Sequence, residues 1–181
     1  EEERYADSLR KVVGSLPQQE GLLLPGTTAF RYSNHFDQYT DPHAFAGKGA
    51  LPAPPEESKE LVTIEVSHPT NDSVFVCSAW FRCRMNLPEM PYLSFTQYDV
   101  QEKVVLQGDI QAAKSTYIIG DWFKAEGIMH IGRQVHKIKL AVNGGSKRFI
   151  AFDELLIYPK NSIYFYKGDQ GRLFLNNRPV N

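Results

Sequence analysis

The feature that most constrains the fold is a run of about nine short apolar segments, each the length of a strand, with no helical repeat between them. In residues 61–68, Val62, Ile64 and Val66 alternate with polar residues, which is typical of a half-buried strand. The other predicted strands are 73–84, 92–99, 102–108, 115–120, 127–132, 136–144, 148–159 and 162–166. Turn sequences such as "HPTND" and "NGG" separate them. This pattern predicts an all-β, antiparallel sandwich or barrel.

Helical periodicity is confined to the start of the chain. Tyr5, Leu9 and Val12 recur at helical spacing, and Gly14 with Pro17 supplies a stop. We therefore predict a short amphipathic N-terminal helix over residues 2–14, which is followed by a loop-rich stretch to about residue 60.

Composition limits the classes of partner. The 181 residues, 42% of them hydrophobic, suffice for one good core. Twenty basic against 21 acidic residues give a formal net charge of −1, so we expect no nucleic-acid partner. No apolar run approaches the roughly 20 residues of a membrane span, so no transmembrane segment is expected. If the protein is exported, its signal peptide lies outside this sequence.

The two cysteines, Cys77 and Cys83, lie in one predicted strand. Their separation of six residues places them on the same face, about 20 Å apart, which is too far for a disulfide. We therefore predict two unpaired thiols, at least partly buried.

Three stretches, in this order, carry a resemblance to a known superfamily: "TDPHAFAGKGAL" (40–51), "VFVCSAWFR" (74–82), and "GDWFKAEGIMHI" with "IKLAVNGGSKRFIAFDELLIYP" (120–159). They resemble the first turn, the first long core strand and the closing half of galactose-binding-like carbohydrate-binding modules. Laminin-G-like sandwiches end in a similar strand, but a long segment precedes theirs, whereas "NGGSKRFIAFDE" leaves room only for a tight hairpin.

The resemblance implies an antiparallel jelly-roll β-sandwich over residues 27–160. Residues 1–26 then form the N-terminal helix and linker, and residues 161–181 a hairpin or the start of the next module. It also implies a non-catalytic carbohydrate-binding-like module of a bacterial extracellular or cell-surface protein, with a glycan and neighbouring domains as partners. The alternative is a structural or protein-interaction spacer domain without a glycan ligand.

Motifs of catalysis are missing from the sequence. The five histidines are scattered, and none forms a helical metal-binding pair; no Gly-x-Ser-x-Gly elbow or phosphate loop is present. Asp153 and Glu154 are adjacent in a predicted strand, which would point them to opposite faces and prevent them from acting as a general acid and base pair. We therefore do not expect an enzyme, although paired carboxylates from different strands stay open.

Aromatic side chains supply the candidate ligand-binding residues, because flat rings stack on the apolar faces of sugars. Tyr92 and Tyr98 lie near the polar residues Gln97 and Asp99, and Trp80 is the third candidate. Trp80 can equally be a core residue, and Trp122 stands where the resembling family keeps a packing tryptophan.

Alternation cannot expose both carboxylates inside "AFDELLIYP" without exposing an apolar row. One of them therefore requires a partner, because an unpaired buried carboxylate is costly. The resemblance implies a structural calcium ion held by Asp153, the main-chain carbonyl of Lys48 and Asp41. The alternative is that Asp153 caps backbone amides or pairs with Lys48 or Arg148.

Overall fold

The computed structural model describes residues 21–22, 30–55, 57–66, 74–83, 90–111, 117–144, 149–167 and 173–179. These residues form antiparallel β-sheets, as the alternation predicts. The helix predicted for residues 2–14 lies outside them. The chain divides into two compact units, residues 28–160 and residues 1–27 with 161–181.

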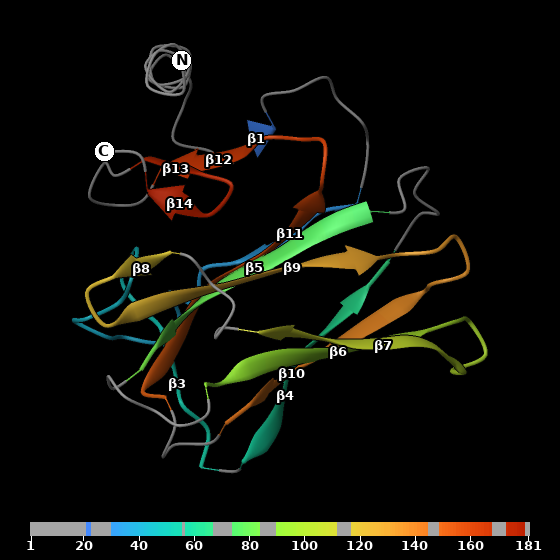
Figure 1. Ribbon diagram of the computed structural model, residues 1–181, viewed down its shortest axis with the longest axis horizontal. Helices are drawn as coiled ribbons and strands as arrows, with labels where there is room; N and C mark the ends of the chain where they lie inside the picture. The colour runs from blue at the N-terminus through green and yellow to red at the C-terminus, as the bar shows by residue number, and fades with distance from the viewer. Residues whose placement is uncertain are drawn as a thin grey trace. The chain divides into compact units, whose positions relative to one another are not determined.

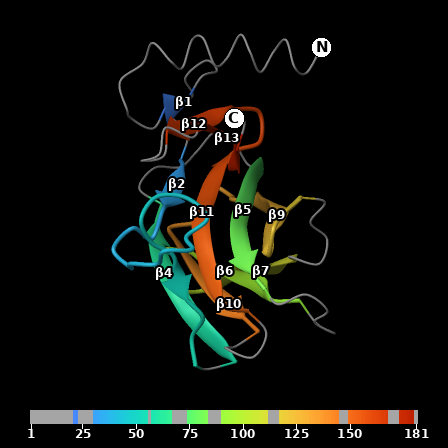
Figure 2. The ribbon, with the colours of Figure 1, turned by 90° about the vertical axis from the view of Figure 1, so that its left-hand side faces the viewer.

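Residues 28–160 form two antiparallel sheets that face each other as a β-sandwich (Figures 1 and 2). Sheet I has the order β2-β11-β5-β9-β8, with β3 also paired to β11. Its strands are β2 (Tyr32–Asn34), β3 (Leu51–Pro52), β5 (Val74–Arg82), β8 (Ile118–Ile119), β9 (Trp122–His130) and β11 (Ala151–Pro159). Sheet II has the order β4-β10-β6-β7. Its strands are β4 (Ser58–Glu65), β6 (Tyr92–Tyr98), β7 (Val104–Gln111) and β10 (Lys137–Asn143).

The core fills the space between sheets I and II. Every second residue of β6 and β10 is buried, which is the period of a strand with one face turned to the core. Aromatic rings pack edge to face in this core: Phe81 contacts Phe152 at a centroid distance of 5.0 Å and Phe149 at 5.5 Å. The two sheets of the sandwich therefore pack through the hydrophobic strand faces that the sequence alternation predicts.

Cys77 and Cys83 are free and buried, and both belong to this core. Burial raises the pKa of each thiol to about 12, and the charge of Asp121 adds to the effect at Cys83. The prediction of two unpaired, buried thiols is confirmed, although Cys83 directly follows β5 and does not belong to the strand. Both thiols stay protonated at neutral pH.

The second unit contains sheet III, with the order β1-β12-β13-β14. Its strands are β1 (Gly21–Leu22), β12 (Tyr164–Lys167), β13 (Leu173–Leu175) and β14 (Arg178–Pro179). Asn176 and Asn177 join β13 to β14 with φ angles of 49° and 63°, which are typical of a two-residue hairpin turn. The sequence predicts a hairpin or the start of another module for residues 161–181, and no pattern in it indicated a turn at Asn176.

Among the described residues, none belongs to a helix that is long and apolar enough to span a membrane.

Candidate functional site

The two carboxylates of β11 lie at a β-bulge. The register between β11 and β5 shifts between Asp153 and Leu156, and Glu154 has a φ of 53°. Phe152 and Leu155 both belong to the core although they are three positions apart, so the alternation skips one residue. A non-glycine residue with this φ is strained and persists only where its surroundings hold it.

The bulge changes what the sequence predicted for the two acids. The alternation expected of an unbroken strand fails at Glu154, and both carboxylates are buried, with exposed fractions of 0% for Asp153 and 2% for Glu154. The sequence predicted that one acid needs a partner; in the structure both have one, from residues that precede β3 in the chain.

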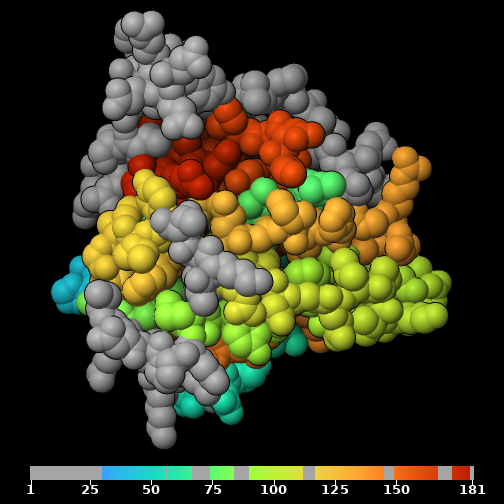
Figure 3. Space-filling view, in the orientation of Figure 1, coloured from blue at the N-terminus to red at the C-terminus, as the bar shows by residue number. Residues whose placement is uncertain are grey.

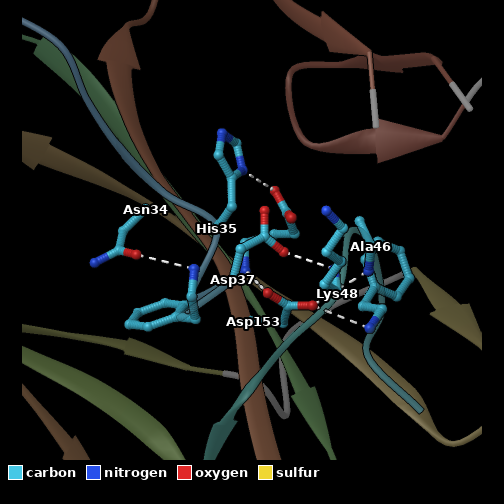
Figure 4. Close-up of polar contacts among 9 residues, drawn as sticks. Asn34, His35, Asp37, Ala46, Lys48 and Asp153 are labelled. Carbon is cyan, nitrogen blue, oxygen red and sulfur yellow. Dashed lines mark hydrogen bonds and ion pairs between the residues drawn. The ribbon is translucent and has the colours of Figure 1, made fainter. Parts of the chain in front are cut away.

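Asp153 holds a loop against β11 through backbone amides. Its Oδ2 accepts hydrogen bonds from the backbone N–H groups of Phe45, at 3.0 Å, and Ala46, at 3.2 Å. Its Oδ1 accepts one from the backbone N–H of Glu154, at 2.8 Å (Figure 4). These three donors give both oxygens of the buried carboxyl group a hydrogen-bond partner. We call residues 35–50 the clamped loop.

Two further side chains fix the start of the clamped loop (Figure 4). The Nδ1 atom of His35, directly after β2, lies 2.7 Å from Oε2 of Glu154. The Oδ1 atom of Asp37 accepts a hydrogen bond of 2.7 Å from the backbone N–H of Lys48, which joins the two ends of the loop. The loop is therefore held by carboxylates at several points along its length.

Glycine is required where the clamped loop folds back on itself. A Cβ atom on Gly49 would lie 1.4 Å from the carbonyl oxygen of Tyr39, and one on Gly47, whose φ is +64°, would lie 2.2 Å from Oδ1 of Asp37. The glycines of "AGKGAL" therefore allow two segments of the clamped loop to approach closely, which a side chain at these positions would prevent.

Burial, together with the charge of the neighbouring Glu154, raises the pKa of Asp153 to about 9, against the opposing effect of the three backbone N–H donors. The buried carboxyl groups of Asp153 and Glu154 are thus neighbours on β11, and that of Glu154 contacts Nδ1 of His35.

The residues predicted to bind calcium lie in one region, and several of their oxygens already accept hydrogen bonds. Both oxygens of Asp153 accept N–H groups, Oδ1 of Asp41 accepts the N–H of His43 at 2.8 Å, and the carbonyl of Lys48 accepts the N–H of Asp41 at 3.2 Å. Within the described residues, no group of three or more His, Cys, Asp or Glu side chains could hold a metal ion. The hydrogen bonds of Asp153 are those of the alternative in which it caps backbone amides, and calcium binding by Asp153, Lys48 and Asp41 stays a prediction.

The candidate Trp80 is fully buried on the outer face of sheet I. Phe45 of the clamped loop stacks on its ring at a centroid distance of 4.0 Å, and Tyr117 packs against its edge at 5.8 Å. Trp122 is also buried and meets the edge of Phe45 at 5.6 Å. Both tryptophans therefore anchor the clamped loop, and Trp80 offers no open ring face to a ligand.

The candidates Tyr92 and Tyr98 begin and end β6, on the face of sheet II that points away from the core. Ser94 and Thr96 lie between them on this face, whereas Gln97 points inward, is 1% exposed and donates to the carbonyl of His130 at 2.7 Å. We call this side of sheet II the polar face.

Strand register arranges the polar face in cross-strand rows. The first row runs across β7, β6, β10 and β4 and contains Gln111, Tyr92, Asn143 and Ser58. The last row contains Val104, Tyr98, Lys137 and Glu65. The rows between them contribute Asp109, Ser94, Ala141, Glu60, Gln107, Thr96, Lys139 and Thr63.

The two tyrosines have different surroundings. Beside Tyr92, the Nδ2 of Asn143 donates to Oγ of Ser94 at 2.9 Å, which orients the amide. The ring of Tyr98 has the Nζ atoms of Lys137 and Lys139 over it, at 5.4 Å and 5.9 Å from the ring centroid.

Several residues of these sites were not found from the sequence. Asn143 shares the alternation of Lys137 and Lys139 in its strand, so its outward direction could have been predicted, but its place beside Tyr92 requires the register of β10 against β6. His35 and Asp37 stand in an irregular stretch with no periodic signal.

Comparison with known proteins gives no further information: no protein-family model matches the sequence, and no curated protein and no solved structure matches the chain.

Proposed function

We propose that this chain is a non-catalytic carbohydrate-binding-like module, and that the polar face of sheet II is its glycan-binding surface. The observation that carries the proposal is the placement of Tyr92 and Tyr98 on one solvent-facing strand side, with hydroxyl and amide side chains between and beside them. Sugars are bound by aromatic rings combined with a few oriented polar groups.

The chain path supports a jelly roll of the galactose-binding-like kind. Between β4 and β11 the chain passes repeatedly from one sheet to the other, so that sequence neighbours such as β4 and β5 lie in different sheets. Double-sheet jelly rolls are built in this way. In the proposed domain organisation, residues 27–160 form this module, and residues 161–181 lead into neighbouring domains of a larger bacterial extracellular or cell-surface protein.

The contacts of the two buried acids agree with a non-catalytic module. Asp153 and Glu154 are engaged with backbone amides and with His35, and both are almost completely buried. A general acid and base pair needs access to substrate, which these positions do not give.

A glycan-array screen with the isolated chain tests the proposal. We expect binding to at least one class of glycan, and loss of that binding in the Tyr92→Ala/Tyr98→Ala double variant with its melting temperature preserved. Tyr39→Ala is the matched control, because Tyr39 is 40% exposed but lies in the clamped loop. An array without any bound glycan, or a double variant that binds as the wild type does, would contradict the proposal.

One observation favours the alternative of a protein-interaction domain. Val100, Val104 and Leu106 are 65%, 47% and 39% exposed, and they lie on or next to β7, the edge strand of sheet II. In Figure 3 atoms of β7 are visible within a yellow-green band. An exposed apolar edge strand can pair with another chain. Concentration-dependent self-association that Val104→Lys abolishes, in a chain that binds no glycan, would support this second function.

A further inference from the structure

We propose that the sugar-stacking position lies at the first row of the polar face alone, with Tyr92 as the platform and Gln111 and Asn143 as flanking hydrogen-bond partners, and that the ligand there is an uncharged sugar. The inference rests on the proposed function and deepens it. Tyr98, at the other end of β6, then has a structural role.

The surroundings of Tyr98 make it a poor platform. Two ammonium groups lie over its ring, and both are tied to acids: Lys137 is hydrogen-bonded to Glu102, and Nζ of Lys139 lies 3.4 Å from Oε2 of Glu60. A sugar that stacked on this ring would have to displace the lysines from a favourable cation–π contact and from their ion pairs. The two lysines therefore already occupy the ring face on which a sugar would stack.

The surroundings of Tyr92 suit a sugar. Its direct cross-strand neighbours are Gln111 on β7 and Asn143 on β10, and opposite residues on one sheet face have Cβ atoms about 5 Å apart. Each amide side chain provides both donors and an acceptor, as vicinal sugar hydroxyls require. The hydrogen bond from Asn143 to Ser94 fixes one of these amides in advance.

Charge distinguishes the two ends of the polar face. The first row contains amide, phenol and hydroxyl side chains and no group charged at neutral pH. The lysines stand at the other end, already paired with carboxylates. The first row offers no cationic side chain to pair with the charge of an anionic sugar. An uncharged sugar brings no charge that needs such a partner.

Affinity electrophoresis tests the inference with named probes: native gels that contain xylan, mixed-linkage β-glucan, galactomannan or the acidic polygalacturonate. The proteins are the wild type, Tyr92→Ala, Tyr92→Phe, Tyr98→Ala and Asn143→Ala, each checked for folding by its melting temperature. We expect an uncharged polysaccharide to retard the wild type. Tyr92→Ala should weaken this binding about tenfold or more, and Asn143→Ala should weaken it less.

The remaining variants separate stacking from structure. Tyr92→Phe keeps the ring and should bind within about twofold of the wild type, and Tyr98→Ala within about threefold. The inference is overturned if Tyr98→Ala weakens binding as much as Tyr92→Ala, or if polygalacturonate alone retards the protein; in both cases the proposed glycan-binding function survives. No retardation by any of the glycans would instead count against the proposed function itself.

Discussion

At the scale of single residues, the main finding is how Asp153 and Glu154 are accommodated inside a strand. Glu154 has a strained, left-handed backbone conformation, and its carboxylate contacts Nδ1 of His35. Asp153 accepts hydrogen bonds from three backbone N–H groups. Polar groups this deeply buried are stable only when their hydrogen bonds are made. The acids therefore serve to attach the clamped loop to sheet I.

The raised pKa of Asp153 predicts a dependence of stability on pH. In the unfolded chain the carboxyl group titrates at about 3.8, and in the folded protein at about 9, so the folded state binds more protons between these values. This group's contribution to the free energy of unfolding therefore falls as pH rises through that window. Urea unfolding between pH 5 and pH 9 should show the wild type losing stability relative to Asp153→Asn as pH rises. A difference between the two proteins that stays constant with pH would contradict the raised pKa.

At the scale of elements, the apolar segments of the sequence located the long strands of sheets I and II, except that β9 begins at Trp122 and its predicted strand began at residue 127. Residues 92–99 and 136–144 were predicted as strands and correspond to β6 and β10. The bulge in β11 was missed because "AFDELLIYP" reads as an unbroken apolar run, in which no residue signals the extra position. The first row of the polar face was missed because register between strands far apart in sequence is a tertiary property.

The clamped loop should depend on Gly49 more than on an ordinary glycine. Gly49→Ala would place a Cβ atom 1.4 Å from the backbone oxygen of Tyr39, so the loop would have to open, and we expect a loss of more than about 2 kcal/mol in the free energy of unfolding. Gly127→Ala is the control: its Cβ would lie 3.4 Å from the nearest atom of Ile110, and it should cost less than about 1 kcal/mol. Equal costs in urea unfolding would show that the backbone approach at Gly49 is not tight.

The same loop gives a test for calcium. Both oxygens of Asp153, one oxygen of Asp41 and the carbonyl of Lys48 already accept N–H groups, with which a calcium ion would compete. If Asp153 only caps amides, the protein should contain no calcium after purification in its presence, and chelator should leave its melting temperature unchanged. Metal analysis and thermal melting measure both. A melting temperature that rises with calcium and falls with chelator would show that the loop rearranges into the ligand set implied by the resemblance.

At the scale of the whole molecule, the two faces of the sandwich serve different purposes. The outer side of sheet I buries Trp80 and Trp122 under the clamped loop, so the aromatic residues there stabilise the fold. The polar face of sheet II keeps its side chains toward solvent, and its first row combines an aromatic ring with two amides. Rigid strands position such side chains more accurately than loops do.

The measurement that tests this account most directly is the mapping of amide chemical shifts by NMR, for a chain of 20.6 kDa, during titration with a glycan that the screen identifies. The account predicts that the largest changes cluster at Tyr92, Gln111 and Asn143, with small changes at Tyr98 and in the clamped loop. Changes that cluster in the clamped loop around Phe45, or that leave β6 unaffected, would contradict it.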